Sequence, residues 1–68
     1  SHSIVQQNQQ KPEADQKLEQ GIQKYEARQY EAAIASLKEA LQRYRAIGYP
    51  AGETMSLVNL GLAHSALS

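Results

Sequence analysis

Apolar residues recur along the first half of this chain at the three- and four-residue spacing of amphipathic helices. The spacing predicts a first helix over about residues 12–27. Pro12 suits its first position, because the N–H that proline lacks would be unpaired there anyway. The stripe that we expect this helix to bury consists of Ala14, Leu18, Gly21, Ile22 and Tyr25.

A longer apolar stripe follows after a corner of three residues. It predicts a second helix over about residues 30–47, antiparallel to the first, because so short a connection turns the chain straight back. Gly48 suits the left-handed residue that ends a helix. We expect Gly21 and the alanines of the second helix to mark the places where the two backbones approach closely. The second stripe consists of Tyr30, Ala33, Ile34, Leu37, Ala40, Leu41, Tyr44 and Ile47.

Residues 49–68 form a third segment of different composition. After Arg45 only Glu53 carries a formal charge, and the apolar residues are spread around most of the helix circumference. Such a helix needs to be covered on more than one side, and the first hairpin can cover only one. We therefore expect this third helix to drive self-association of the chain. The residues predicted at that contact are Leu57, Leu60, Ala63, Ala66 and Leu67.

The segment before Pro12 has a different character. Residues 1–11 hold one short apolar pair and a glutamine-rich tract. Such a tract buries too little apolar surface to offset the entropy lost on ordering, so we predict a disordered tail. Ser1 and His2 are typical of the remnant of a cleaved tag and are left out of the fold prediction.

Length and charge narrow the class of protein. A chain of 68 residues makes one small domain, which buries only roughly 60% of its unfolded surface. Seven acidic and seven basic residues cancel, which argues against a nucleic-acid binder. No apolar run approaches the length that spans a bilayer, so we expect no membrane partner. The absence of cysteine excludes disulfides and fits a cytoplasmic or a periplasmic protein equally.

Candidate chemistry is sparse. His64 is the one histidine in the predicted helices, and no cysteine or serine–acid pair accompanies it at a useful spacing. We expect His64 to pack between helices, and we predict no enzyme activity, no metal and no cofactor.

The third helix aligns with the first. Residues 60–64 match residues 20–24, which places Gly21 and Gly61 40 residues apart. A period of this size, built from helix–turn–helix units, is typical of solenoids. The residues resemble a tetratricopeptide repeat (TPR) of the extended-period type. The matching positions are Tyr30, Ala33, Ile34, Leu37, Ala40 and Leu41 in the second helix, and Leu57, Leu60 and Gly61 in the third, with His64 where an aromatic is expected.

The chain also departs from the TPR pattern. Lys17, Gln20 and Lys24 stand at the large positions of the first helix, and Leu18 and Tyr25 supply the bulk one residue later. The proline that usually closes a repeat is absent. The resemblance implies an all-α, antiparallel helix–turn–helix solenoid fragment of three helices. One full repeat covers residues 12–48, and residues 49–68 form the first helix of a second.

The resemblance further implies a protein–protein interaction module, which binds a peptide or helix of a partner in a groove lined by the first helix of each repeat. Leu18 and Ile22 stand where a carboxylate clamp for chaperone tails would need polar groups, so apolar partners are favoured. An alternative is a structural unit whose groove is filled by its own copies, with no separate ligand. The implied groove residues are Asp15, Leu18, Glu19, Ile22, Tyr25, Met55, Val58, Asn59, Leu62 and Ser65.

Overall fold

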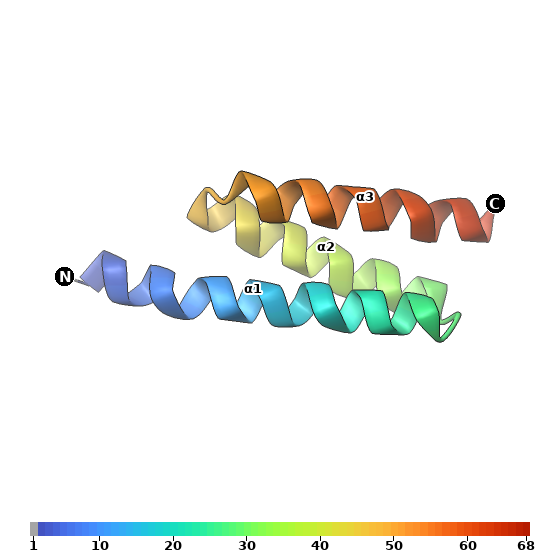
Figure 1. Cartoon of the computed structure of the whole chain (residues 1–68), viewed down its shortest axis with the longest axis horizontal. Coiled ribbons are helices and arrows are strands. Elements are labelled where there is room, and N and C mark those ends of the chain that lie inside the picture. The colour runs from blue at the N-terminus through green and yellow to red at the C-terminus, as the bar shows by residue number, and fades with distance from the viewer. Residues whose placement is uncertain (1) are drawn as a thin grey trace.

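The structure is a computed structural model of the 68-residue chain. It describes residues 9–68 with their side chains and residues 2–8 as helical backbone only; Ser1 lies outside it. Three helices follow one another, α1 (His2–Glu26), α2 (Tyr30–Ile47) and α3 (Pro50–Leu67) (Figure 1). The part of the chain so described contains no strand, and the all-α prediction is confirmed.

Each helix packs mainly on its neighbour in sequence. α2 lies between α1 and α3, and α1 and α3 flank it on either side (Figure 1). The contact between α1 and α2 is the longest, that between α2 and α3 is shorter, and α1 meets α3 only briefly. The molecule is therefore elongated, measuring 45 × 17 × 13 Å.

The helix α1 begins earlier than predicted, because residues 9–11 are already helical and Pro12 lies inside the helix. Two contacts of Lys11 stabilise this extension. Its Nζ donates a hydrogen bond to Asp15 Oδ2 one turn later, at 3.0 Å, and lies 4.9 Å from the centre of the Tyr49 ring. The rest of the predicted disordered tail, residues 1–8, lies outside the residues described with side chains.

The first two helices end in the same way. α2 has the predicted bounds and is followed by Gly48, which adopts the expected left-handed conformation with a φ of 66°. Arg28 takes the same conformation after α1, with a φ of 64°. At both ends the next residue donates its N–H to the carbonyl five residues earlier, at 3.0 Å and 2.8 Å, which closes a Schellman motif.

Small residues let α1 and α2 approach closely, as predicted. A Cβ built on Gly21 would lie 2.6 Å from the side chain of Leu37, so the leucine occupies the space above the glycine. Ala33 and Ala40, on either side of Leu37, are fully buried. The core consists of Ala14, Leu18, Ala33, Leu37, Ala40, Leu41, Tyr44, Leu60 and Ala63.

The helix α3 packs on α2 through a stripe of mostly small residues, Gly52, Ser56, Leu60 and Ala63. A Cβ on Gly52 would lie 2.3 Å from the ring of Tyr44, so this glycine is required for the close approach of the two helices. The hydroxyl of Ser56 is fully buried and has no hydrogen-bond partner among the described residues.

Candidate protein interaction surface

The helix α3 carries large apolar side chains that are exposed. Five of them are each between 48% and 57% exposed, and three of these, Leu57, Val58 and Leu62, lie on the side opposite α2. The helix has no Asp, Glu, Lys or Arg from residue 54 to residue 68, so the surface around these three side chains carries no formal charge. Contiguous exposed apolar surface on a soluble protein is typical of a protein interaction site. The five residues are Met55, Leu57, Val58, Leu62 and Leu67.

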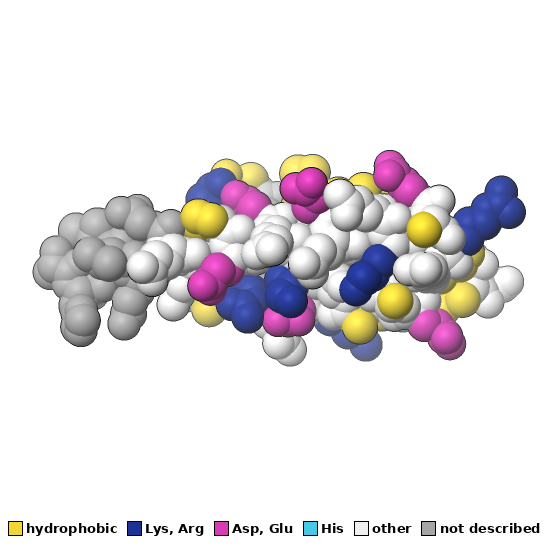
Figure 2. Space-filling view, turned by 90° about the horizontal axis from the view of Figure 1, so that it is seen from below, with side chains coloured by type: hydrophobic (Ala, Val, Ile, Leu, Met, Phe, Trp, Pro, Cys, Tyr) yellow, Lys and Arg dark blue, Asp and Glu magenta, His cyan; other side chains and the backbone are white. Residues whose placement is uncertain are grey.

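The outer face of α1 has the opposite character. Gln16, Glu19, Gln20 and Gln23 line a shallow, open hollow on it. Gln23 Nε2 donates a weak hydrogen bond to Glu19 Oε1 at 3.4 Å. Figure 2 shows this side of the molecule, where uncharged polar atoms and scattered charges predominate over apolar side chains. The outer face of α1 is therefore polar, whereas the exposed side of α3 is largely apolar.

Aligning α1 with α3, 40 residues later in the chain, shows which side of α3 is exposed to solvent. Gly21 of α1 is covered by Leu37 of α2, but Gly61, its equivalent in α3, has no atom within 4 Å of a built Cβ. Leu18 is buried, but its equivalent Val58 is 57% exposed. The face of α3 that corresponds to the α2-covered face of α1 thus faces solvent. We call it the open stripe of α3, and it consists of Thr54, Leu57, Val58, Gly61, Leu62 and Ser65, all of them exposed.

The α1 half of the predicted groove is smaller than expected. Leu18 is buried in the core between the helices, so its assignment to the groove surface is wrong. Ile22 and Tyr25 are partly buried and pack against the core. Glu19 is exposed and belongs to the polar hollow on the outer face, whereas Asp15 takes part in a hydrogen-bonded junction described below.

The α3 half of the predicted groove is accessible. Met55, Val58 and Leu62 are about half exposed, and Ser65 is exposed. Asn59 is half-buried, and its Nδ2 donates a hydrogen bond to the carbonyl oxygen of Met55 at 2.8 Å. Its amide is therefore engaged within its own helix.

The predicted self-association residues divide into two groups. Leu60 and Ala63 are buried against α2 within the chain, so placing them at a contact between chains is wrong. Leu57, Ala66 and Leu67 are exposed. His64 is exposed as well, so it does not pack between the helices of this chain as predicted.

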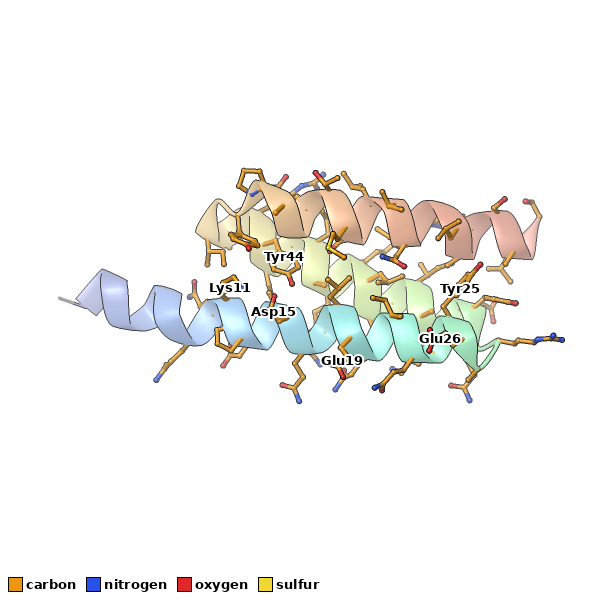
Figure 3. All side chains as sticks on the ribbon, in the orientation of Figure 1. Lys11, Asp15, Glu19, Tyr25, Glu26 and Tyr44 are labelled. Carbon is orange, nitrogen blue, oxygen red and sulfur yellow. The ribbon has the colours of Figure 1, made fainter. Side chains whose placement is uncertain are left out.

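A polar junction lies at the end of the molecule where α2 turns into α3. The Tyr44 hydroxyl donates a hydrogen bond to Asp15 Oδ1, and Asp15 also accepts one from Lys11 (Figure 3). The rings of Tyr44 and Tyr49 lie 5.7 Å apart. The junction thereby connects α1, α2 and the corner that leads into α3, and nothing in the spacing of the sequence indicated it.

The same contacts shift two pKa values. The hydrogen bond from Tyr44 lowers the pKa of the Asp15 carboxyl below its ordinary value, against the opposing effect of burial, and Lys11 lowers it further. Burial, followed by the hydrogen bond to Asp15, raises the pKa of the Tyr44 phenol. The folded state thus favours an ionised Asp15 beside a neutral Tyr44.

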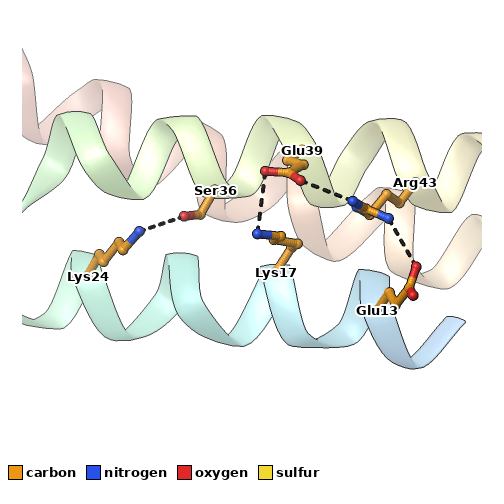
Figure 4. A network of polar contacts seen from close by, with 6 residues as sticks. All are labelled: Glu13, Lys17, Lys24, Ser36, Glu39 and Arg43. Carbon is orange, nitrogen blue, oxygen red and sulfur yellow. Dashed lines mark hydrogen bonds and ion pairs between the residues drawn. The ribbon is translucent and has the colours of Figure 1, made fainter. Parts of the chain in front are cut away.

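The lysines that depart from the TPR pattern have polar partners on α2 (Figure 4). Lys24 Nζ donates to Ser36 Oγ at 3.0 Å, and Lys17 Nζ lies 3.7 Å from Glu39 Oε1. Arg43 pairs with Glu13 and Glu39, each at 3.2 Å. Polar contacts thus line this side of the α1–α2 pair.

Within residues 9–68, no group of three or more His, Cys, Asp or Glu side chains could hold a metal ion. None of the described helices has both the length and the apolar character needed to cross a membrane. Family models, curated proteins and solved structures were compared with the chain. None matches it.

Proposed function

We propose that this chain is a TPR-like protein–protein interaction module, which binds an apolar α-helix of a partner along the open stripe of α3. The observation that carries this proposal is the set of three half-exposed, large apolar side chains, Leu57, Val58 and Leu62, in a stripe without a formally charged residue. A partner that covers them removes apolar surface from water, which is the main driving force of association.

The α1–α2 contact indicates what kind of helix would suit the stripe. Leu37 lies above Gly21, and alanines on either side of it keep the two backbones close. The open space above Gly61 would accept a leucine-sized side chain, as in the α1–α2 contact, or the backbone of a helix with a small residue at the crossing. Docking an apolar helix face in this way is a common mode of peptide recognition. Because the stripe is uncharged, the affinity should depend little on salt.

The proposed surface extends to further residues of the groove predicted from the sequence. Ile22 and Tyr25 contribute partly buried side chains from α1, and Met55 and Leu62 contribute exposed ones from α3. The TPR-like assignment rests on the 40-residue recurrence of glycine and on the buried residues Ala33, Leu37 and Ala40 of α2.

The experiment is a titration of the full chain with a synthetic peptide of its own residues 29–48. This peptide carries the face of α2 that packs on α1, with Leu37 between Ala33 and Ala40. Fluorescence anisotropy of the labelled peptide gives the dissociation constant. Leu62→Glu places a charge on the binding face and should weaken binding at least tenfold, whereas Gln16→Glu, on the polar face of α1, should leave it unchanged. Absence of saturable binding, or equal losses in both variants, would refute the proposal.

A further inference from the structure

We infer that the open stripe of α3 binds a second copy of this chain, with the two α3 helices packed antiparallel and crossing at Gly61. The inference rests on the proposed function and names its partner. Three features of the molecule favour a second copy over an unrelated helix, and each concerns a different property of the surface.

The first feature is the contrast between the two outer faces. A head-to-tail stack would press α3 of one copy against the outer face of α1 of the next, and would bury the amides of Gln16, Gln20 and Gln23 on apolar side chains. Burying amides without hydrogen-bond partners is costly. Pairing α3 with α3 brings apolar surface onto apolar surface, and a two-fold symmetric contact of this kind closes after two copies.

The second feature is charge. The open stripe contains no formally charged residue, and the chain as a whole has no net charge at pH 7 when its histidines are neutral. Two copies therefore approach each other without the electrostatic repulsion that keeps strongly charged proteins apart.

The third feature is the spacing of the stripe. Thr54, Val58, Gly61 and Ser65 are four, three and four residues apart, which is the alternation of a two-helix seam. With Gly61 opposite the partner's Gly61, the space above each glycine lets the two backbones approach. Leu57 and Leu62 border the seam on its two sides and would cover it from both copies.

The absence of cysteine from the chain permits a direct test. Gly61→Cys adds a thiol at a position where a Cβ meets no atom within 4 Å beyond its own stretch of helix, so the variant should fold. Under mild oxidation it should form a disulfide-linked dimer rapidly, because the two residues meet at the crossing. Gln16→Cys, on the outer face of α1, is the matched control and should stay monomeric over the same period.

Sedimentation equilibrium of the unmodified chain provides the second measurement. The average mass should rise with concentration from 7.5 kDa towards twice that value, and Val58→Glu should return it to one copy. A strict monomer, growth beyond two copies, or equal cross-linking of the two cysteine variants would overturn the inference. If the chain is a strict monomer but still binds the peptide of residues 29–48, the proposed function survives; if both experiments fail, neither stands.

Discussion

Two glycines of α3, Gly52 and Gly61, predict opposite responses to alanine substitution. A methyl group on Gly52 would lie 2.3 Å from the Tyr44 ring, whereas one on Gly61 would meet nothing within 4 Å. Carbon atoms in contact normally lie about 3.5–4.0 Å apart. The Gly52 variant therefore needs a shift of more than about 1 Å between α2 and α3.

The magnitude follows from two opposing effects. Alanine is favoured over glycine in a helix interior by about 1 kcal/mol, and less in the first turn, where Gly52 lies. Overpacking costs about 1–3 kcal/mol, and the upper end applies here because Tyr44 is buried and its hydroxyl is bonded to Asp15, so the ring cannot move aside. We expect Gly52→Ala to destabilise the fold by about 2 kcal/mol and Gly61→Ala to stabilise it by about 1 kcal/mol.

The assay is urea unfolding followed by circular dichroism at low protein concentration. With a urea dependence of about 1 kcal/mol per molar, the two variants should differ in midpoint by about 2–3 M. Equal midpoints, or a Gly52 variant more stable than the Gly61 variant, would refute the close packing of α3 on Tyr44.

Three further predictions concern single residues. Arg28→Gly should raise the free energy of unfolding by about 0.5–1 kcal/mol, because glycine adopts the left-handed conformation of residue 28 without strain. Gly48→Ala should lower it by about 1 kcal/mol for the opposite reason. Thermal unfolding of both variants will show whether the two changes have opposite signs. Ser56→Ala should stabilise by about 1 kcal/mol, because it removes a buried hydroxyl with no partner, and a loss in urea midpoint would contradict this. Folding lowers the pKa of Asp15, so its carboxylate contributes fully to the free energy of unfolding above the unfolded pKa near 3.8 and loses this contribution as the pH falls through the folded pKa. Asp15→Asn should therefore weaken the loss of stability at acid pH. An unchanged loss, measured by urea unfolding at a series of pH values, would be inconsistent with the junction.

The helix α2 was predictable from the sequence because its apolar stripe is unbroken and Gly48 ends it. The bounds of α1 were harder to predict for a physical reason. Its N-terminal extension is held in part by Lys11 on Tyr49, a contact between residues far apart in the chain. At its other end Arg28 adopts the left-handed conformation, which a sequence normally reveals by a glycine at that position.

The candidate surface was predictable only in part, because α3 lacks a stripe. With apolar residues all round, the periodicity could not tell which side faces α2, and Leu60 and Ala63 were assigned to the wrong one. The correct side is marked by Gly52, which is small enough to lie against Tyr44, and by the buried Ser56, and neither is hydrophobic enough to enter a stripe. The open side of α3 became clear only from the contrast between Gly21 and Gly61.

The sequential packing of the helices has a consequence for folding. Because each helix packs mainly on its neighbour in sequence, most contacts close short loops, and a topology of low contact order is expected to fold in microseconds to milliseconds. Stability in such a linear arrangement is close to a sum of nearest-neighbour terms. The α1–α2 hairpin, which has the longer contact, can therefore persist while α3 detaches and returns. Amide hydrogen exchange should be fastest in α3, the helix that carries the proposed interface. A partner bound to α3 would slow the exchange of the amides in this helix.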